Sequence, residues 1–416
     1  SNGWALELIN PDVLCLGAHN WTGSQANDQA TPAQENSVFD PTFVMDFNLE
    51  SASVLSLNKV ELVFSKNLDV NTVVSSNFIL DQGVSVTSIH MDPEVLNIVE
   101  LTISPQFEVG KVYTVTINGV LDCAGGSLLS NVAEVKLPDF QDVLINEVLF
   151  NPNTGGSDFV ELYNRTSQDI DLKDWSLLYF NSSGDSAYKI ITNTTHVLKP
   201  GAFVVLTEDS ANVKYEYPNS KEGTFLYMDL PTYSNAEGDV IVLNQMGLLG
   251  DRFQYNEDMH FELLNTVKGV SLERINYLPG ENTSNNWHSA ASTSDFATPG
   301  FQNSQYLSTT ATGAHVTISP KTFTPNNDGY KDVLSIAYSF NNDGNVVTLT
   351  VHNADGQLIR TLVNNQSVGT EGTFQWDGMN DNGELMPTGM YIILMRVFDL
   401  DNNQQVIKNV TVLAIP

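Results

Sequence analysis

Short runs in which apolar and polar residues alternate recur along this chain, and they constrain its fold more than any other feature. Gly, Asn and Asp turns separate the runs at intervals of roughly 8 to 12 residues, the spacing typical of β-sandwiches and barrels. No stretch has the apolar periodicity of a full-length amphipathic helix. We therefore expect an all-β chain of serial sandwich domains. The clearest runs are 60–64, 112–117, 203–206, 240–243 and 347–351.

Breaks rich in proline or polar residues divide the sequence. At roughly 150 residues per domain, a chain of 416 residues is expected to hold about three units. The breaks fall near Asp40-Pro41, near Leu137-Pro138 and between Ser308 and Gly313. They predict a short N-terminal piece and three domains, with the boundaries 1–40, 41–140, 141–308 and 312–416.

An internal repeat accounts for the short N-terminal piece. Four blocks recur in the same order, with one residue inserted after the second block, and such self-similarity indicates a repeated module. We expect residues 1–40 to be the last strands of a module whose complete copy lies in 141–308. We also expect the parent protein to continue upstream with that module. The matched blocks are 6–10 with 272–276, 20–21 with 286–287, 30–32 with 297–299, and 36–37 with 303–304.

The charge of the chain excludes several classes of partner. Lys and Arg number 18 against 49 Asp and Glu, which gives a net charge of −31. Nucleic acids and anionic lipids are bound by clustered Lys and Arg, so we expect no nucleic-acid partner. The longest apolar run, Met390–Met395, is far shorter than a membrane span, so no membrane insertion is expected. A Lys-poor chain rich in Asn, Thr and Ser indicates an extracytoplasmic location, either secreted or on the outer cell surface.

Residues 142 to about 305 carry a series of motifs that resembles the lamin tail domain, an immunoglobulin-like sandwich of nuclear lamins and bacterial surface proteins. The resemblance implies that Trp175 and its neighbours face inward, as bulky residues between two sheets do. The stretch 208–237 has no counterpart in the family pattern, so we expect a long insertion or loop there. The motifs are 144–148, 158–164, 172–177, 198–201, 269–274, Trp287, 298–300 and Asn303.

The flanking regions resemble two other immunoglobulin-like families. Residues 41–138 resemble the bacterial Ig-like modules that precede or separate lamin tail domains, through 60–65, 99–103, 110–115 and 119–125. Residues 314–416 resemble the FlgD-type Ig-like domain found at the C-termini of secreted bacterial proteins, through 323–329, 353–356, 376–378, 381–383 and 387–391. The fold class implied is all-β, with serial immunoglobulin-like β-sandwich domains.

No catalytic constellation is present in the sequence. There is no nucleophile elbow, HExxH helix, phosphate-binding loop or dinucleotide-binding glycine pattern, and the histidines lack metal-ligand spacing. Glu147 and Glu161 fall in two strand motifs of the lamin tail domain and are placed to face each other. Paired carboxylates serve in glycoside hydrolysis. We interpret these two instead as hydrogen-bond acceptors of the strands, and we predict that the chain is not an enzyme.

Calcium is the one cofactor with support from the residues. Asn326, Asp328 and Asp332 place oxygen atoms around the Gly329 turn, and a hard cation binds several oxygens of a short loop. The loop lacks the length and the closing Glu of an EF-hand. The alternative is a set of Asx-turn hydrogen bonds, which needs the same residues.

Two groups of aromatic residues are candidates for binding. The five tryptophans lie in or beside family or repeat motifs, so we expect them to pack in cores rather than to stack on carbohydrate. Four tyrosines cluster in the stretch 208–237, where exposed rings on a loop would form a better binding surface. These tyrosines are Tyr215, Tyr217, Tyr227 and Tyr233.

The only two cysteines are Cys15 and Cys123. Cys15 lies in a turn of the N-terminal piece, and the corresponding turn of the complete copy, around 279–285, has no cysteine. We therefore predict that Cys15 bonds to the neighbouring domain through a disulfide with Cys123, as an oxidising compartment would favour. The alternative is two separate buried thiols.

These observations favour a non-catalytic part of a secreted or cell-surface bacterial multidomain protein, with structural display or adhesion-type interaction as its role. Its partner would be an extracellular protein or glycan of unknown identity. The alternative is a set of accessory modules, some of which bind glycan, within a larger secreted hydrolase whose catalytic domain lies outside this sequence. Chromatin binding by analogy with nuclear lamins is disfavoured by the charge.

Overall fold

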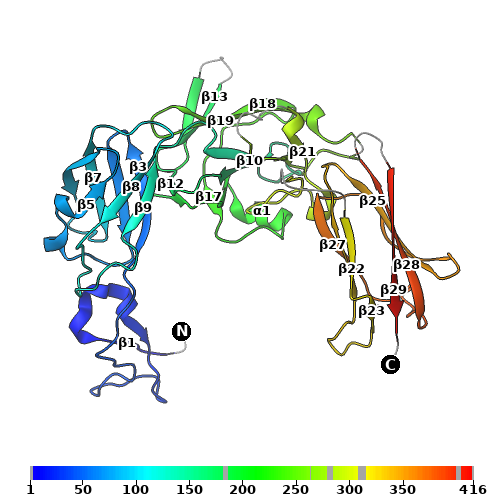
Figure 1. The fold of residues 1–416 in the computed structure, drawn as a ribbon, viewed down its shortest axis with the longest axis horizontal. Coiled ribbons are helices and arrows are strands. Elements are labelled where there is room, and N and C mark those ends of the chain that lie inside the picture. Colours follow the sequence, from blue (N-terminus) through cyan, green and yellow to red (C-terminus); the bar gives the residue numbers. More distant parts are fainter. Residues whose placement is uncertain are drawn as a thin grey trace.

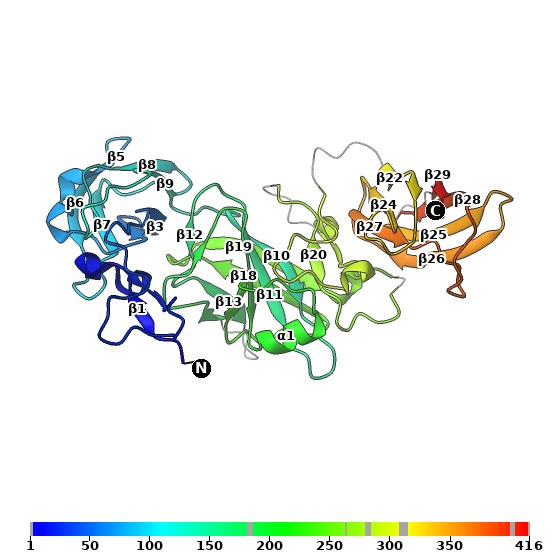
Figure 2. The ribbon, with the colours of Figure 1, turned by 90° about the horizontal axis from the view of Figure 1, so that it is seen from below.

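A computed structural model describes residues 3–180, 186–262, 264–278, 284–307, 315–399 and 404–414. The chain is all-β, as expected, and its sandwiches form an arch with the N-terminal part and the C-terminal domain as its two arms (Figure 1). Seen from below, the parts follow one another in a row (Figure 2). Within the described residues, no helix has both the length and the apolar character needed to cross a membrane.

The first forty residues form a small hairpin unit. Strands β1 (Leu6–Leu8) and β2 (Trp21–Gly23) pair antiparallel, and the 3-10 segment η1 (Pro11–Asn20) connects them. Asn10 caps η1 by accepting a hydrogen bond from the Asp12 N–H, 3.0 Å between the heavy atoms. Among the described residues 3–40, Leu16 is the only buried apolar side chain, so this part of the unit has no core of its own.

Residues 41–140 enclose one hydrophobic core between two sheets. The alternation in β4 buries Val60, Leu62 and Phe64, while the residues between them are partly exposed. One sheet has the order β3 (Leu49–Ser56), β4 (Lys59–Phe64), β7 (Ile98–Ser104), β6 (Ser85–His90). The other has the order β5 (Phe78–Leu80), β8 (Val112–Ile117), β9 (Val132–Lys136), with η2 (Val70–Thr72) and η3 (Ser75–Asn77) before β5.

The middle domain packs a six-stranded sheet against a four-stranded one, with Trp175 fully buried in the core. The six-stranded order is β17 (Phe225–Tyr227), β16 (Phe203–Thr207), β11 (Phe159–Asn164), β10 (Val143–Leu149), β20 (Leu272–Arg274), β21 (Trp287–Ser289). The four-stranded order is β14 (Ser186–Ile190), β13 (Ser176–Phe180), β18 (Glu237–Leu243), β19 (Leu249–Asn256). The remaining elements are β12 (Ile170–Asp171) paired with β15 (Val197–Leu198), α1 (Ser210–Glu216), η4 (Glu257–Met259), η5 (Ser284–Asn286) and η6 (Ser292–Ser294).

The stretch 208–237 is more than a loop. Asp209 caps the short helix α1 by accepting from the Asn212 N–H, and β17 then adds to the six-stranded sheet in parallel with β16. The stretch was expected to be a long insertion or loop, and the structure shows that it contains regular elements, which no local pattern in the sequence predicts.

The C-terminal domain packs two sheets around Trp376, which is fully buried. Their orders are β22 (His315–Ser319), β24 (Leu334–Ser339), β27 (Glu371–Trp376), and β23 (Thr322–Phe323), β29 (Gln404–Leu413), β28 (Gly389–Phe398), β25 (Val346–Asn353), β26 (Leu358–Ser367). The predicted boundary at 308–312 lies outside the described residues.

Candidate functional site

Three glutamates form a row across the centre of the six-stranded sheet. Glu147 on β10 is the register partner of Glu161 on β11 on one side and of Glu273 on β20 on the other. Register partners in a sheet place their side chains on the same face. All three carboxyl groups are fully buried. Glu147 and Glu161 therefore face each other as the sequence predicted, and Glu273, which the sequence analysis did not single out, completes the row.

The row binds the segment that follows the last strand of the domain. The Thr298 N–H donates to Glu147 Oε1 at 2.9 Å, and the Thr298 hydroxyl donates to Glu273 Oε1 at 2.8 Å. The Gly300 N–H donates to Glu161, and the Gln305 N–H donates to Glu273 Oε2 at 2.9 Å. We call residues 298–305 the exit segment, because the C-terminal domain follows it. The carboxylates thus hold the exit segment against the sheet.

Burial changes the protonation of the row. Desolvation, followed by the charge of Glu273, raises the pKa of Glu147 to about 8. Burial likewise raises the pKa of Glu273, and burial together with the charge of Glu147 raises the pKa of Glu161 well above its ordinary value. Neighbouring buried carboxyl groups cannot all ionise readily, so burial and mutual repulsion favour the protonated form within the row.

The row does not have the form of a catalytic site. A glycosidase needs its two carboxyl groups on either side of an open substrate cleft. Here all three are shielded from solvent, and they accept hydrogen bonds from their own chain. A buried ion pair, Arg274 Nη2 to Asp251 Oδ2 at 2.5 Å, lies beside the row and joins β20 to β19. The arrangement is that of an anchor for the exit segment.

The two cysteines join the N-terminal unit to the domain of residues 41–140. Cys15 in η1 and Cys123 form a disulfide, with an S–S distance of 2.09 Å and a Cα–Cα distance of 6.1 Å. Asn67 supports it, since its Nδ2 donates to the Cys15 carbonyl at 3.3 Å and its carbonyl accepts from the Cys123 N–H at 2.9 Å. Next to it, Lys66 and Asp122 make a buried ion pair at 2.8 Å.

The loop proposed for calcium is held by hydrogen bonds of its own. Asp332 accepts from the N–H groups of Asn326, Asn327 and Gly329 at 3.1, 2.7 and 2.7 Å. Asp328 accepts from Asn326 Nδ2 at 3.0 Å and from the Tyr330 N–H at 2.8 Å. These are the Asx-type bonds of the alternative interpretation, and they engage the oxygens that a cation would need. Calcium binding at this loop stays a prediction. Over the described ranges, no group of three His, Cys, Asp or Glu side chains is placed to hold a metal ion.

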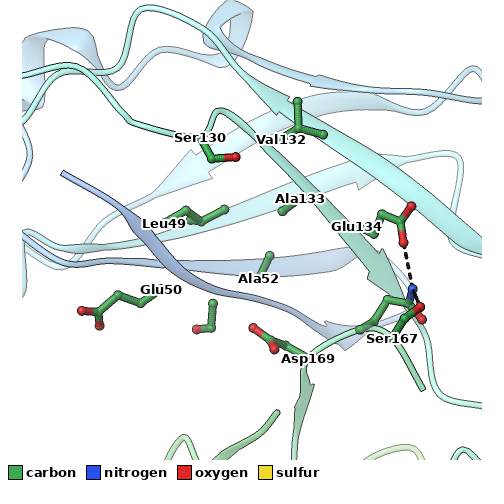
Figure 3. A pocket seen from close by; sticks show the side chains of 11 residues that line it. Leu49, Glu50, Ala52, Ser130, Val132, Ala133, Glu134, Ser167 and Asp169 are labelled. Carbon is green, nitrogen blue, oxygen red and sulfur yellow. Dashed lines mark hydrogen bonds between the residues drawn. The ribbon is translucent and has the colours of Figure 1, made fainter. Parts of the chain in front are cut away.

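A polar groove lies where residues 41–140 meet the middle domain (Figure 3). It has a volume of about 300 Å³. Glu134 on its wall accepts a hydrogen bond from Gln168 Nε2 at 2.9 Å, the dashed line in Figure 3, and Asp169 pairs with Lys199 at 2.8 Å. Glu50 is the third acidic side chain of the lining. No nucleophile with an adjacent base lines the groove, so we interpret it as part of the domain junction.

The aromatic expectations held only in part. Trp175, Trp287 and Trp376 are buried in cores, but Trp4 and Trp21 are exposed. The expectation of core packing was wrong for these two, because no sheet in the described part of the chain packs against the hairpin unit that carries them. Of the four tyrosines, Tyr215 and Tyr227 are exposed, whereas Tyr217 and Tyr233 are buried, so no four-tyrosine surface exists.

The signal that could have found Glu273 was present in the repeat. Glu273 and Glu7 occupy the same position in the first matched block. A carboxylate that occurs at the same position of both copies, between apolar strand residues, indicates that it has an equivalent hydrogen-bond partner in each copy. The partners, Thr298 and Thr31, lie in the third matched block.

Comparison with known proteins places three families along the chain. The lamin tail domain matches residues 138–257, the FlgD Ig-like domain matches residues 324–397, and a bacterial Ig-like domain matches residues 41–140. No curated protein matches the chain.

Solved structures give weaker similarities. The N-terminal part of the bacterial S-layer protein SbsC is 16% identical over 40% of this chain and 42% of that chain, with a TM-score of 0.21. FLGD from P. aeruginosa is 20% identical over 20% of this chain and 63% of that one, with a TM-score of 0.17. Dimeric latent PorU from Porphyromonas gingivalis is 9% identical over 92% and 36%, with a TM-score of 0.20. The chain spans 42%, 63% and 54% of the first three solved structures it matches.

Proposed function

We propose that this chain, in which a bacterial Ig-like domain, a lamin tail domain and a FlgD Ig-like domain follow one another, is a non-catalytic structural part of a bacterial cell-surface or secreted protein. Its role is to hold binding surfaces of that protein at a fixed spacing and orientation. The observation that carries the proposal is that both domain junctions are closed by specific hydrogen bonds. Domains joined only by a flexible linker would sample many orientations.

The first junction joins the bacterial Ig-like domain to the lamin tail domain. Gln245 Nε2 donates to the Val54 carbonyl at 3.1 Å, and Gln168 Nε2 donates to Glu134 at 2.9 Å. Lys199 Nζ donates to the Glu50 carbonyl. These contacts come from separate loops of the lamin tail domain, so they resist rotation about the connecting strand.

The second junction joins the exit segment to the FlgD Ig-like domain. The Thr370 N–H donates to the Ser304 carbonyl at 2.8 Å, and the Gly344 N–H donates to Gln305 Oε1 at 3.1 Å. Ser304 also donates through its hydroxyl to Glu273 at 2.8 Å. The glutamate row therefore fixes the same segment on which the next domain rests.

An extracytoplasmic location is supported by two features of the chain. The Cys15–Cys123 disulfide is a bond that oxidising compartments preserve and reducing ones do not. The net charge of −31 suits a surface that avoids anionic polymers and membranes.

Rigidity can be measured directly between the two arms of the arch. Spin labels on Glu94→Cys and Asp355→Cys lie on exposed residues of the first and last domains. We expect a single narrow distance distribution by pulsed electron resonance. A broad distribution like that of a flexibly tethered pair would contradict the proposal.

The absence of catalysis needs its own test. We expect background rates when the purified chain is screened against esterase, phosphatase, nuclease and glycosidase substrates. Turnover that Glu147→Gln or Glu161→Gln removes would contradict this part of the proposal.

A further inference from the structure

The sequence repeat is also a repeat of structure. In the N-terminal unit Leu6 pairs with Gly23 and Leu8 pairs with Trp21. In the lamin tail domain Leu272 pairs with Ser289 and Arg274 pairs with Trp287. Each residue of the first set differs from its counterpart by the same offset, so β1–β2 reproduces the register of β20–β21.

Side-chain hydrogen bonds repeat with it. Glu7 accepts from the hydroxyls of Thr31 and Ser37, each at 2.7 Å. Glu273 accepts from the hydroxyls of Thr298 and Ser304, each at 2.8 Å. The asparagine contacts also match: the Asn10 N–H donates to Asn20 Oδ1 and the Asn276 N–H donates to Asn286 Oδ1, both at 2.9 Å. Over the described residues of both copies, the N-terminal unit thus shares the strand register and these side-chain hydrogen bonds with the end of the lamin tail domain.

The two copies differ in what covers them. Leu272 has no exposed surface and pairs with Val148 on β10, whereas Leu6 is 71% exposed. Trp287 is 4% exposed and stacks on Phe253, whereas Trp21 is 48% exposed. β20 lies between β10 and β21, but in the described part of the chain β1 pairs with β2 alone. The edge of β1, the Leu6 side chain and the Trp21 side chain of β2 are therefore uncovered where the complete copy is covered.

Two backbone N–H groups of the N-terminal unit also lack the partners that their counterparts have in the complete copy. The N–H groups of Thr298 and Gly300 donate to Glu147 on β10 and to Glu161 on β11. Their counterparts are Thr31 and Ala33. Among the described residues, neither the Thr31 N–H nor the Ala33 N–H donates a hydrogen bond. Ala33 even keeps a positive φ of 61°, the counterpart of the φ of 86° at Gly300. Two donors are thus presented where two carboxylates are bound in the complete copy.

We propose that the edge of β1 is the docking surface for the first part of another lamin tail domain, which contributes a strand pair of the β10–β11 type. The occupant has an apolar residue opposite Leu6, a glutamate opposite Glu7, and a second glutamate within reach of the Ala33 N–H. It would contact residues 4–40 as residues 138–269 contact residues 270–305 in the complete copy. This inference concerns the N-terminal unit and does not depend on the role proposed for the whole chain.

A second copy of the chain is a poorer occupant. Its own β10 is already paired on both edges, with β11 and with β20, and it cannot pair with β1 unless its sheet opens. Edge strands with uncovered apolar residues are prone to unwanted pairing. A strand pair that covers the edge of β1 would prevent such pairing.

The test adds the missing part from the chain itself. Residues 138–269 are placed directly ahead of residue 4 in the full chain, and Leu6→Cys reports on the β1 edge through its rate of labelling by a maleimide. We expect labelling to slow by roughly tenfold or more in the extended chain, because a covered edge reacts only when it opens. Glu35→Cys, an exposed loop position of the same unit, is the matched control and should label at the same rate in both chains.

A second variant tests the chemistry of the contact. Val148→Asp in the added segment places a charge opposite Leu6, and we expect it to restore fast labelling. The proposal would be overturned if Leu6→Cys were labelled equally fast in the extended and the unextended chain. This holds whether or not the added residues fold. Protection that appears without the extension and grows with protein concentration would also overturn it, because it would identify a second copy as the occupant.

Discussion

Glu147 lies directly across from Glu273 in the register of β10 and β20, and both buried carboxyl groups accept hydrogen bonds from Thr298. One residue of the exit segment is therefore bound by two strands at once. The Thr298 N–H is committed to Glu147, while its hydroxyl is committed mainly to Glu273. We therefore expect the strength with which the row holds the exit segment to depend on the charge state of the row.

The first prediction is a fall in stability as pH rises. Glu147 has a folded-state pKa of about 8, above its ordinary value, so the folded state favours the protonated form. Its contribution to stability is fully present below the ordinary pKa of about 4.5 and is lost as pH rises toward 8. The loss is at most about 1.4 kcal/mol per pH unit for one proton. Melting temperatures measured from pH 4.5 to 8.5 check it.

A neutral side chain separates this effect from other titrations. Glu147→Gln removes the ionisable group, and we expect a flatter pH dependence of the melting temperature than in the wild type. Glu237→Gln, on an exposed position of β18 in the same domain, is the control and should leave the pH dependence unchanged. If the melting temperature fell equally steeply with pH in all three proteins, the row would not be the titrating group.

Sequence patterns were sufficient for the strands and the families but not for the row. The alternation of apolar and polar residues predicted β4 and β8. The family motifs predicted that Glu147 and Glu161 lie on neighbouring strands. Glu273 was missed because β20 lies far from β10 along the chain, and no local pattern states which distant strands pair. The exposure of Trp21 was missed for a related reason: whether a residue is buried depends on a neighbour, and motif position alone does not reveal whether that neighbour is present.

The second prediction concerns the disulfide. A bond between residues 108 apart in sequence restricts the unfolded chain, which the chain-entropy model credits with at most about 4 to 5 kcal/mol. We expect Cys15→Ser with Cys123→Ser to lower the melting temperature of the bacterial Ig-like domain and to make residues 3–40 sensitive to protease. Thiol titration of the wild type, denatured without reductant, should find no free thiol. Two free thiols per chain would rule the bond out.

The third prediction concerns the loop of Asn326, Asp328 and Asp332. Asp332 accepts three backbone N–H bonds, so we expect Asp332→Ala to destabilise the FlgD Ig-like domain by about 1.5 to 3 kcal/mol, the net range for hydrogen bonds to a charged group. The loss should be the same in chelator and in millimolar calcium if the loop needs no ion. A calcium-dependent rise in the wild-type melting temperature that Asp328→Ala removes would instead establish a calcium site.

The last prediction concerns the second junction. A Cβ on Gly369 would lie 2.5 Å from the Ser304 carbonyl oxygen, closer than real contacts allow, and backbone cannot yield as a flexible side chain can. We therefore expect Gly369→Ala to displace the FlgD Ig-like domain and to shift or broaden the distance between labels on residues 94 and 355. Gly389→Ala, in the same domain, is the matched control, because its nearest contact would be at 4.0 Å. If the junction fixes the arch, only Gly369→Ala changes the distance, while the domain's own unfolding transition stays where it was. An unchanged distance in Gly369→Ala would mean that the Ser304 contact does not set the orientation.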